Sequence, residues 1–227
     1  MTELRCVRGL LFLGAILALV VSTTPAQASN GETEHMLNTA QATCDQDCRK
    51  RQGARYVKEI QEHFTIKGEP IHPFVFRDFE GYMSDRRPVI TAIDVLAGVN
   101  SNYYFSDDVK KSPYGYMARD SDGQSHYHYS FLGRLENGLL VVRADSNGGG
   151  SGVFGTLYFL DVFVDTASDD EGKPYTRVNL KTVRTVAMGD RWGGDITIDG
   201  NKVTISGTRM AHMGGPKTTR IIEVQRP

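Results

Sequence analysis

The sequence predicts an all-β fold, an antiparallel sandwich or barrel, with one N-terminal helix after a cleaved signal peptide. From His72 onward, glycine, tyrosine, valine and threonine are frequent, and turn-forming residues recur every several positions. Short strands separated by turns, with no helices between them, are typical of antiparallel sandwiches and barrels. Two turn pairs, Asn137-Gly138 and Gly200-Asn201, each separate segments that divide into a polar and an apolar face.

The first 28 residues have the pattern of a secretory signal peptide. Arg5 and Arg8 form a positive n-region, and an uncharged apolar run follows from Gly9 to Val21. Residues 25–28, Pro-Ala-Gln-Ala, then form a small-residue cleavage site. The apolar run is too short to span a bilayer comfortably. We therefore expect cleavage before Ser29, a periplasmic or secreted protein, and no transmembrane segment after cleavage.

Residues 29–43 are polar, and we expect them to form a mobile N-terminal segment. Residues 44–68 then predict an amphipathic helix, because apolar side chains recur there at three- and four-residue spacing while charged ones fill the other face. Residues 69–227 complete the chain as one antiparallel β domain. The apolar positions of the helix are Tyr56, Val57, Ile60 and Phe64.

Two cysteines, Cys44 and Cys48, remain after signal cleavage. An even number of cysteines in an exported protein favours a disulfide. On one helical turn their Cα atoms would lie about 6 Å apart, within reach of a bridge. Such a bridge closes a short loop and stabilises little, so free thiols or bonds between chains stay open as alternatives. The run from Thr43 to Gln46 also resembles a capping box that opens the helix.

Eleven segments of the β domain have strand-like composition between turn signals. The segment 153–165 is apolar on both faces and should lie in the interior of a sheet. Asp161 interrupts it and needs a partner, for which the basic residues 177, 181 and 184 are candidates. The expected strands lie near 72–79, 88–97, 101–105, 114–119, 124–136, 139–145, 153–165, 174–188, 194–199, 202–208 and 218–225.

The two turn pairs predict strand registers. A two-residue loop at Gly200-Asn201 places Ile198 opposite Val203 and Ile196 opposite Ile205 on one dry face. A two-residue loop at Asn137-Gly138 also sorts its strands into a dry and a wet face. That loop pairs Leu135 with Leu140, Gly133 with Val142, Ser130 with Asp145, and His128 with Asn147.

His126 and His128 form the most metal-like motif. Alternate residues of a strand point to one face, so both imidazoles could reach one ion, with Asp145 as a third ligand. The same face carries Arg134 and Arg143, which indicates that it is solvent-exposed. We expect no other cofactor, and a divalent metal only at this face.

Two glycine-rich loops are candidates for ligand or partner contact. Residues 146–152 include Asn147 and connect two strands, and residues 189–195 hold Arg191 and the single tryptophan, Trp192. A Trp-Arg pair can anchor an interface, but the tryptophan can equally be a plug that covers one end of the fold. Tyr103 and Tyr104 add aromatic surface suited to a protein or a carbohydrate.

Charge and motifs narrow the function. The chain has 26 basic and 27 acidic residues, which argues against nucleic acid as a partner. The sequence has no Gly-x-Ser-x-Gly or His-Glu-x-x-His motif, so we lean against an enzyme.

We therefore expect an exported, non-enzymatic binding or inhibitor-like module. It would contact a protein or a glycan of the cell envelope through loops 146–152 and 189–195. A metal-binding protein or metal-dependent hydrolase that uses His126, His128 and Asp145 is the first alternative. A structural envelope component is the second, and the oligomeric state is open.

Overall fold

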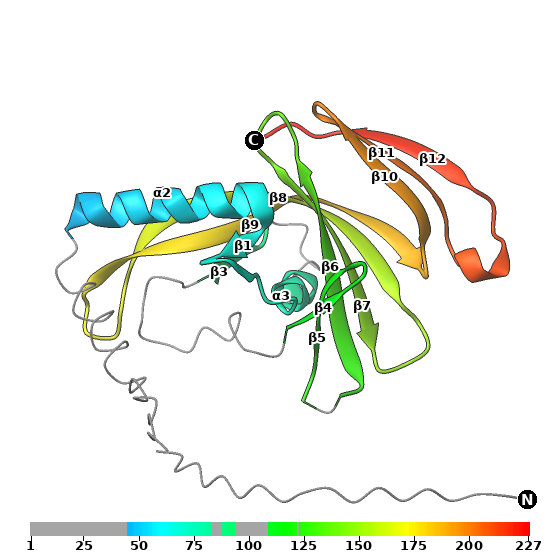
Figure 1. Cartoon of the computed structure of the whole chain (residues 1–227), viewed down its shortest axis with the longest axis horizontal. Helices are drawn as coiled ribbons and strands as arrows, with labels where there is room; N and C mark the ends of the chain where they lie inside the picture. Colours follow the sequence, from blue (N-terminus) through cyan, green and yellow to red (C-terminus); the bar gives the residue numbers. More distant parts are fainter. Residues whose placement is uncertain (1–44, 83–87, 94–108, 122) are drawn as a thin grey trace, which may run out of the picture. The chain divides into compact units, whose positions relative to one another are not determined.

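The structure is a computed structural model that describes residues 45–82, 88–93, 109–121 and 123–227. The signal peptide, Cys44, Tyr103 and Tyr104 lie outside these residues. The described part is mostly antiparallel β-sheet with few helices, which confirms the all-β class (Figure 1).

In chain order the elements are α2 (Gln46–His63), β1 (Thr65–Ile66), β2 (Glu69–Pro70), α3 (Val75–Tyr82), β3 (Ile90–Ile93), β4 (Lys110–Ser112), β5 (Gly115–Arg119), β6 (Ser125–Arg134), β7 (Leu140–Gly148), β8 (Phe154–Ser168), β9 (Pro174–Asp190), β10 (Gly193–Asp199), β11 (Lys202–Thr208), η3 (Ala211–Met213, a 3-10 helix) and β12 (Thr218–Glu223).

The predicted N-terminal helix is present as α2, but it is shorter than expected. Its N-cap is Asp45, whose Oδ1 accepts a hydrogen bond from the Cys48 N–H at 2.7 Å, so the capping box at Thr43 was wrong. The helix ends at Phe64, which takes a left-handed conformation. The predicted Cys44–Cys48 disulfide includes a residue outside the described part and stays a prediction. Among the described residues, no helix has the length and apolarity needed to cross a membrane.

A second helix, α3 (Val75–Tyr82), covers most of the segment 72–79 that we expected to be a strand. The sequence there is rich in phenylalanine and valine, which favour strands. However, its fully buried residues Val75, Phe76 and Phe79 follow a helical spacing, and Pro73 precedes the first turn. Burial of this face against the sheet outweighs the strand propensity.

Seven strands form one antiparallel sheet in the order β3-β9-β8-β7-β6-β5-β4. The strands from β4 to β9 therefore follow one another in space as they do in sequence, whereas β3 pairs with β9 at the far edge. Strand β8 has a neighbour on each side, and Tyr158 and Phe159, which point to opposite faces, are both fully buried. The prediction of an interior strand at 153–165 is confirmed. A second sheet has the order β10-β11-β12, and β1 and β2 form a small hairpin.

The two faces of the seven-stranded sheet have separate cores. Leu140 and Val142 of β7 belong to the helical core, which α2 and α3 cover. Val141, between them, belongs to the inter-sheet core, which the three-stranded sheet covers. Figure 1 shows α2 running alongside β8 and β9. The described fold thus has a helical layer, a large sheet and a small sheet.

The β6–β7 hairpin differs from the predicted register. The Leu135 N–H donates to the Leu139 carbonyl at 2.8 Å, so the turn has three residues and ends at Gly138, whose φ is 90°. A bulge between Phe131 and Gly133 shifts the pairing once more. From Ser125 to Phe131 the two shifts of one residue add to two, so each side chain keeps its predicted face although its partner changes. Between the bulge and the turn only one shift applies, so the pairing of Leu135 with Leu140 was wrong and Leu135 lies in the inter-sheet core with Val141. The observed pairs include His128 with Asp145, His126 with Asn147, and Ser130 with Arg143.

The β10–β11 hairpin has the predicted register, with Ile198 opposite Val203 and Ile196 opposite Ile205. Asp161 of β8 finds its partner outside the neighbouring strand that we expected. Its Oδ1 accepts a hydrogen bond from Arg226 Nη2 at 2.7 Å.

Candidate functional site

A groove of about 730 Å³ opens between the two sheets, and we call it the inter-sheet groove. One wall is the face of β4 to β7 that carries Ser112, His128 and Asp145. The other wall is the segment that enters β10, with Trp192 and Ile196. The groove therefore joins parts of the chain that lie far apart in the sequence.

The groove brings together site residues that the sequence predicted separately. His126, His128 and Asp145 line it, and so do Arg191 and Trp192 from the second loop. We expected the face of His128 to be exposed to bulk solvent, and this was wrong. The side chains of His128 and Asp145 are only 17% and 13% exposed, because the small sheet covers part of this face.

The polar side chains on the floor of the groove form a connected chain. Ser112 Oγ lies 3.1 Å from His128 Nε2, and Asp145 Oδ2 lies 3.7 Å from His128 Nδ1. Asp145 Oδ1 in turn accepts a hydrogen bond from Arg143 Nη2 at 2.9 Å. The imidazole of His128 is therefore held between a hydroxyl and a carboxylate.

Two glycines make room for this arrangement. Gly115 lies opposite Ser112, and a Cβ there would collide with the Tyr129 carbonyl on β6. Gly155 lies opposite Asp145, and a Cβ there would stand 3.0 Å from Asp145 Oδ1. Side chains at these positions would displace the backbone of the groove wall or the carboxylate.

His126 lies beside these polar side chains, and the pKa of its imidazole is lowered. Partial burial lowers the pKa of its imidazole, and Coulombic interactions with Arg119 and with the neighbouring His128 lower the pKa further. His126 thus favours its neutral form. In the register it faces Asn147, not Asp145.

The metal prediction gains no support from this geometry. Within the described residues, no three histidine, cysteine, aspartate or glutamate side chains are arranged to hold a metal ion. The pair His126–Asn147 lies two positions along the strands from the pair His128–Asp145. A metal site at this face stays a prediction.

Asn147 has a structural role in its loop. Its Nδ2 donates to the Gly150 and Gly152 carbonyls at 3.0 and 2.9 Å, and its Oδ1 accepts from the Gly149 N–H at 2.8 Å. The side chain is buried, so it shapes the 146–152 loop from within.

Of the two predicted roles for Trp192, the structure supports a buried side chain that fills the fold and not an exposed interface anchor. It is 7% exposed and belongs to the inter-sheet core, while the Arg143 guanidinium lies 5.0 Å from its ring centre. Arg191 connects the two candidate loops, because it pairs with Asp190 at 2.8 Å and donates to the Ser151 carbonyl.

Ser112 was not among the site residues predicted from the sequence. It ends the three-residue strand β4, which is too short to show an alternating pattern. The signal that could have found it is the turn Pro113-Tyr114-Gly115 directly after it, which indicates a hairpin into β5. Even so, its approach to His128 depends on the position of a third strand.

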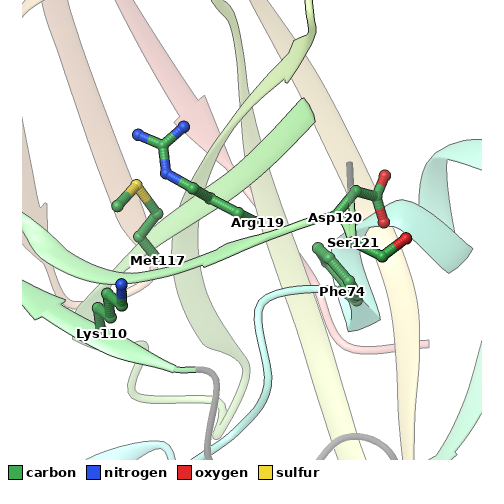
Figure 2. Close-up of a pocket in the computed structure, with 6 residues that line it drawn as sticks. All are labelled: Phe74, Lys110, Met117, Arg119, Asp120 and Ser121. Atoms are coloured by element: carbon green, nitrogen blue, oxygen red, sulfur yellow. The ribbon is translucent and has the colours of Figure 1, made fainter. Parts of the chain in front are cut away.

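A second, smaller hollow of about 440 Å³ lies near β4 and β5. Figure 2 shows Lys110, Met117 and Arg119 apart from Phe74 and Asp120. Asp120 is already paired with Arg77 at 3.3 Å, and the mixed charges of this hollow converge on no common point. The inter-sheet groove is therefore the stronger candidate site.

No protein-family model matches this chain, and no curated protein or solved structure gives a match either. The chemistry of the groove therefore carries the functional conclusion.

Proposed function

We propose that the protein is an exported binding module whose ligand lies in the inter-sheet groove. The ligand class that fits is an amphipathic molecule with an apolar acyl or alkyl chain and a polar group. The observation that carries this proposal is the division of the groove, in which Leu132, Val153 and Ile196 supply apolar walls around the polar floor at His128. Its volume falls in the usual range for small-molecule sites.

The sequence led us to expect a protein or an envelope glycan as the partner. A bare glycan usually needs an open aromatic platform, and the buried Trp192 offers little ring surface for one. Tyr114 lines the groove and is 79% exposed, and Met213, which shares the short helix η3 with the groove-lining Ala211, is 69% exposed. This distribution favours an apolar chain, free or carried by an envelope molecule, over sugar alone.

The single tryptophan offers a direct test, because Trp192 lines the groove and reports on its occupancy. We expect decanoate to change the tryptophan emission of the purified protein in a saturable way, and chitohexaose to leave it unchanged. The variant Ile196→Glu places a charge on the apolar wall and should abolish the response to decanoate.

The matched control is Ile221→Glu, because Ile221 is 69% exposed on β12 and does not line the groove. This variant should bind decanoate like the wild type. Binding that survives Ile196→Glu, or a response to chitohexaose alone, would contradict the proposal. Thermal melting of each variant identifies a loss caused by unfolding.

Export rests on the N-terminal sequence pattern. Protein recovered from the periplasm or the medium should begin at Ser29. N-terminal sequencing and intact mass measure this directly. A mature protein that keeps residues 1–28 would refute cleavage.

A further inference from the structure

We propose that Ser112, His128 and Asp145 form a serine–histidine–aspartate site that hydrolyses a carboxylic ester held in the inter-sheet groove. This inference rests on the proposed function, since the groove must hold the apolar acyl chain of the ester. It goes beyond binding, because it assigns a reaction and names the atoms that carry it.

The first contact is that between the nucleophile and the base. Ser112 Oγ lies 3.1 Å from His128 Nε2, which is hydrogen-bonding distance. The Tyr114 N–H donates to the same Oγ at 3.2 Å, so the hydroxyl hydrogen of Ser112 is available to the imidazole. The bond between serine and histidine is the one that activates a hydroxyl for attack.

The second contact orients the base. Asp145 Oδ2 lies 3.7 Å from His128 Nδ1, on the side of the ring opposite Ser112. A carboxylate there favours the tautomer with hydrogen on Nδ1 and leaves the Nε2 lone pair facing the serine. Catalytic hydrogen bonds are often longer in ligand-free proteins and shorten with substrate.

Asp145 is itself held in place. Arg143 donates to Asp145 Oδ1 from Nη2 at 2.9 Å, and Arg143 Nη2 also lies 3.3 Å from the Trp192 carbonyl. These contacts fix the carboxylate while its second oxygen faces His128. Asp145 therefore acts as a positioning residue, and Ser112 and His128 are the catalytic residues.

Access and burial are consistent with a reaction site. Ser112, His128 and Asp145 all line the groove, and the last two are largely shielded from solvent. Shielding strengthens the electrostatic interaction between the ring and the carboxylate. An acyl chain along Leu132 and Ile196 would bring its carbonyl carbon to the polar floor where Ser112 lies.

The reaction needs water as its only other reactant. Ser112 Oγ forms a bond to the carbonyl carbon while its proton moves to His128 Nε2. The carbon–oxygen bond of the ester breaks, and the leaving alcohol takes that proton. Water then attacks the acyl-serine and gives a proton to Nε2. The acyl–Oγ bond breaks, Ser112 regains the proton, and a carboxylic acid is released with no change in oxidation state.

The first experiment needs no variant. The purified wild-type protein is incubated with a fluorophosphonate that carries an alkyl chain, and the modified residue is located by mass spectrometry. We expect covalent modification at Ser112. Modification of another serine, or of none, overturns the inference.

The second experiment measures turnover of p-nitrophenyl hexanoate. Ser112→Ala and His128→Gln should each lower the turnover number by about 100-fold or more, as removal of a triad member does. The matched controls Ser206→Ala and His63→Gln, at positions that do not line the groove, should leave it unchanged. Turnover that persists in Ser112→Ala overturns the inference.

Asp145→Asn tests positioning. It should lower the turnover number and the rate of fluorophosphonate labelling while the Michaelis constant changes little, because the groove walls stay intact. An Asp145→Asn protein that is labelled at the wild-type rate contradicts this role.

The binding titration separates the two proposals. A protein that binds decanoate but neither labels at Ser112 nor turns over the ester refutes the hydrolytic site alone. A protein that does not bind decanoate yet labels at Ser112 refutes the proposed binding function and leaves the nucleophile in place.

Discussion

Arg226 Nη2 lies 2.7 Å from Asp161 Oδ1, so an ion pair connects the C-terminal tail to β8, an interior strand of the larger sheet. The Asp161 side chain is only 17% exposed. Close by in the chain, the Val224 carbonyl accepts a hydrogen bond from Asn137 Nδ2 at 2.7 Å, at the β6–β7 turn. The tail thus links the small sheet to the large one at two points.

Loss of this ion pair should destabilise the fold. Arg226→Ala leaves the largely buried Asp161 carboxylate without its guanidinium, and we expect the free energy of unfolding to fall by about 1–3 kcal/mol. Urea denaturation measures the change. The control Arg220→Ala removes an exposed arginine of β12 and should cost less than about 0.5 kcal/mol. Equal effects from the two variants would show that the pair contributes nothing specific.

Gly207 leaves the space that the indole ring of Trp192 fills. A Cβ at this position would overlap the indole ring of Trp192. We expect Gly207→Ala to cost about 1–3 kcal/mol and to shift the tryptophan emission to the red as water reaches the ring. Gly150→Ala serves as the control, because a Cβ there meets open space. An unshifted emission in Gly207→Ala would contradict the packing described.

Gly53 lets α2 approach the sheet closely. A Cβ at this position would stand 3.0 Å from Val164 Cγ1 and 3.0 Å from Thr176 Cγ2. Gly53→Leu should therefore lower the free energy of unfolding by about 1–3 kcal/mol, although leucine favours the helix. Gln52→Leu, on the exposed face of α2, gains the same propensity without the clash and should be neutral or slightly stabilising. Thermal melting compares the two, and a stabilised Gly53→Leu would disprove close docking.

Glu80 gives the stability a pH dependence. Burial raises the pKa of this carboxyl, although hydrogen bonds from Ser146 and Tyr127 partly oppose the shift. The Tyr127 hydroxyl donates to Glu80 Oε2 at 3.2 Å, and burial together with the charge of Glu80 raises the pKa of Tyr127 to about 12.

A raised carboxyl pKa means that the folded state holds its proton more tightly than the unfolded state. The stabilisation from Glu80 is present below its unfolded pKa of about 4.3 and is lost as the pH rises through the folded value. Glu80→Gln keeps a neutral acceptor for Tyr127, so we expect it to be more stable than the wild type at pH 7. Urea denaturation at pH 4 and at pH 7 should show that this difference shrinks in acid. A difference that grows as the pH falls would contradict a raised pKa of Glu80 in the folded state.

Local chemistry explains which parts of the fold were predictable. The Gly200-Asn201 hairpin was correct because a tight turn and two clear faces specify one register. The predicted register of the Asn137-Gly138 hairpin was wrong because the same dipeptide also fits a three-residue turn. In addition, no local sequence pattern indicates the bulge at Leu132. The α3 segment was misassigned because the surface that buries its apolar face comes from distant strands.

The candidate site was predicted only in part. His126, His128 and Asp145 could be placed on one face, because alternation along a strand survives a shift of two residues. Their neighbours could not be predicted, since Ser112 and Trp192 reach the groove from separate hairpins. The covering of this face by the small sheet also depends on long-range packing that has no local pattern.

The order of strands in the large sheet has a consequence for folding kinetics. From β4 to β9 each strand pairs with its sequence neighbour, so these contacts form by closing short loops. Strand β3 is the exception, because the Val89 N–H bonds to Thr182 Oγ1 across 93 residues of chain. Among the strand pairs of this sheet, closing that long loop has the largest entropic cost, so β3 should add to the sheet after the main barrier. Interactions formed so late slow unfolding more than they speed folding, and the β3 edge would therefore set the lifetime of the native state.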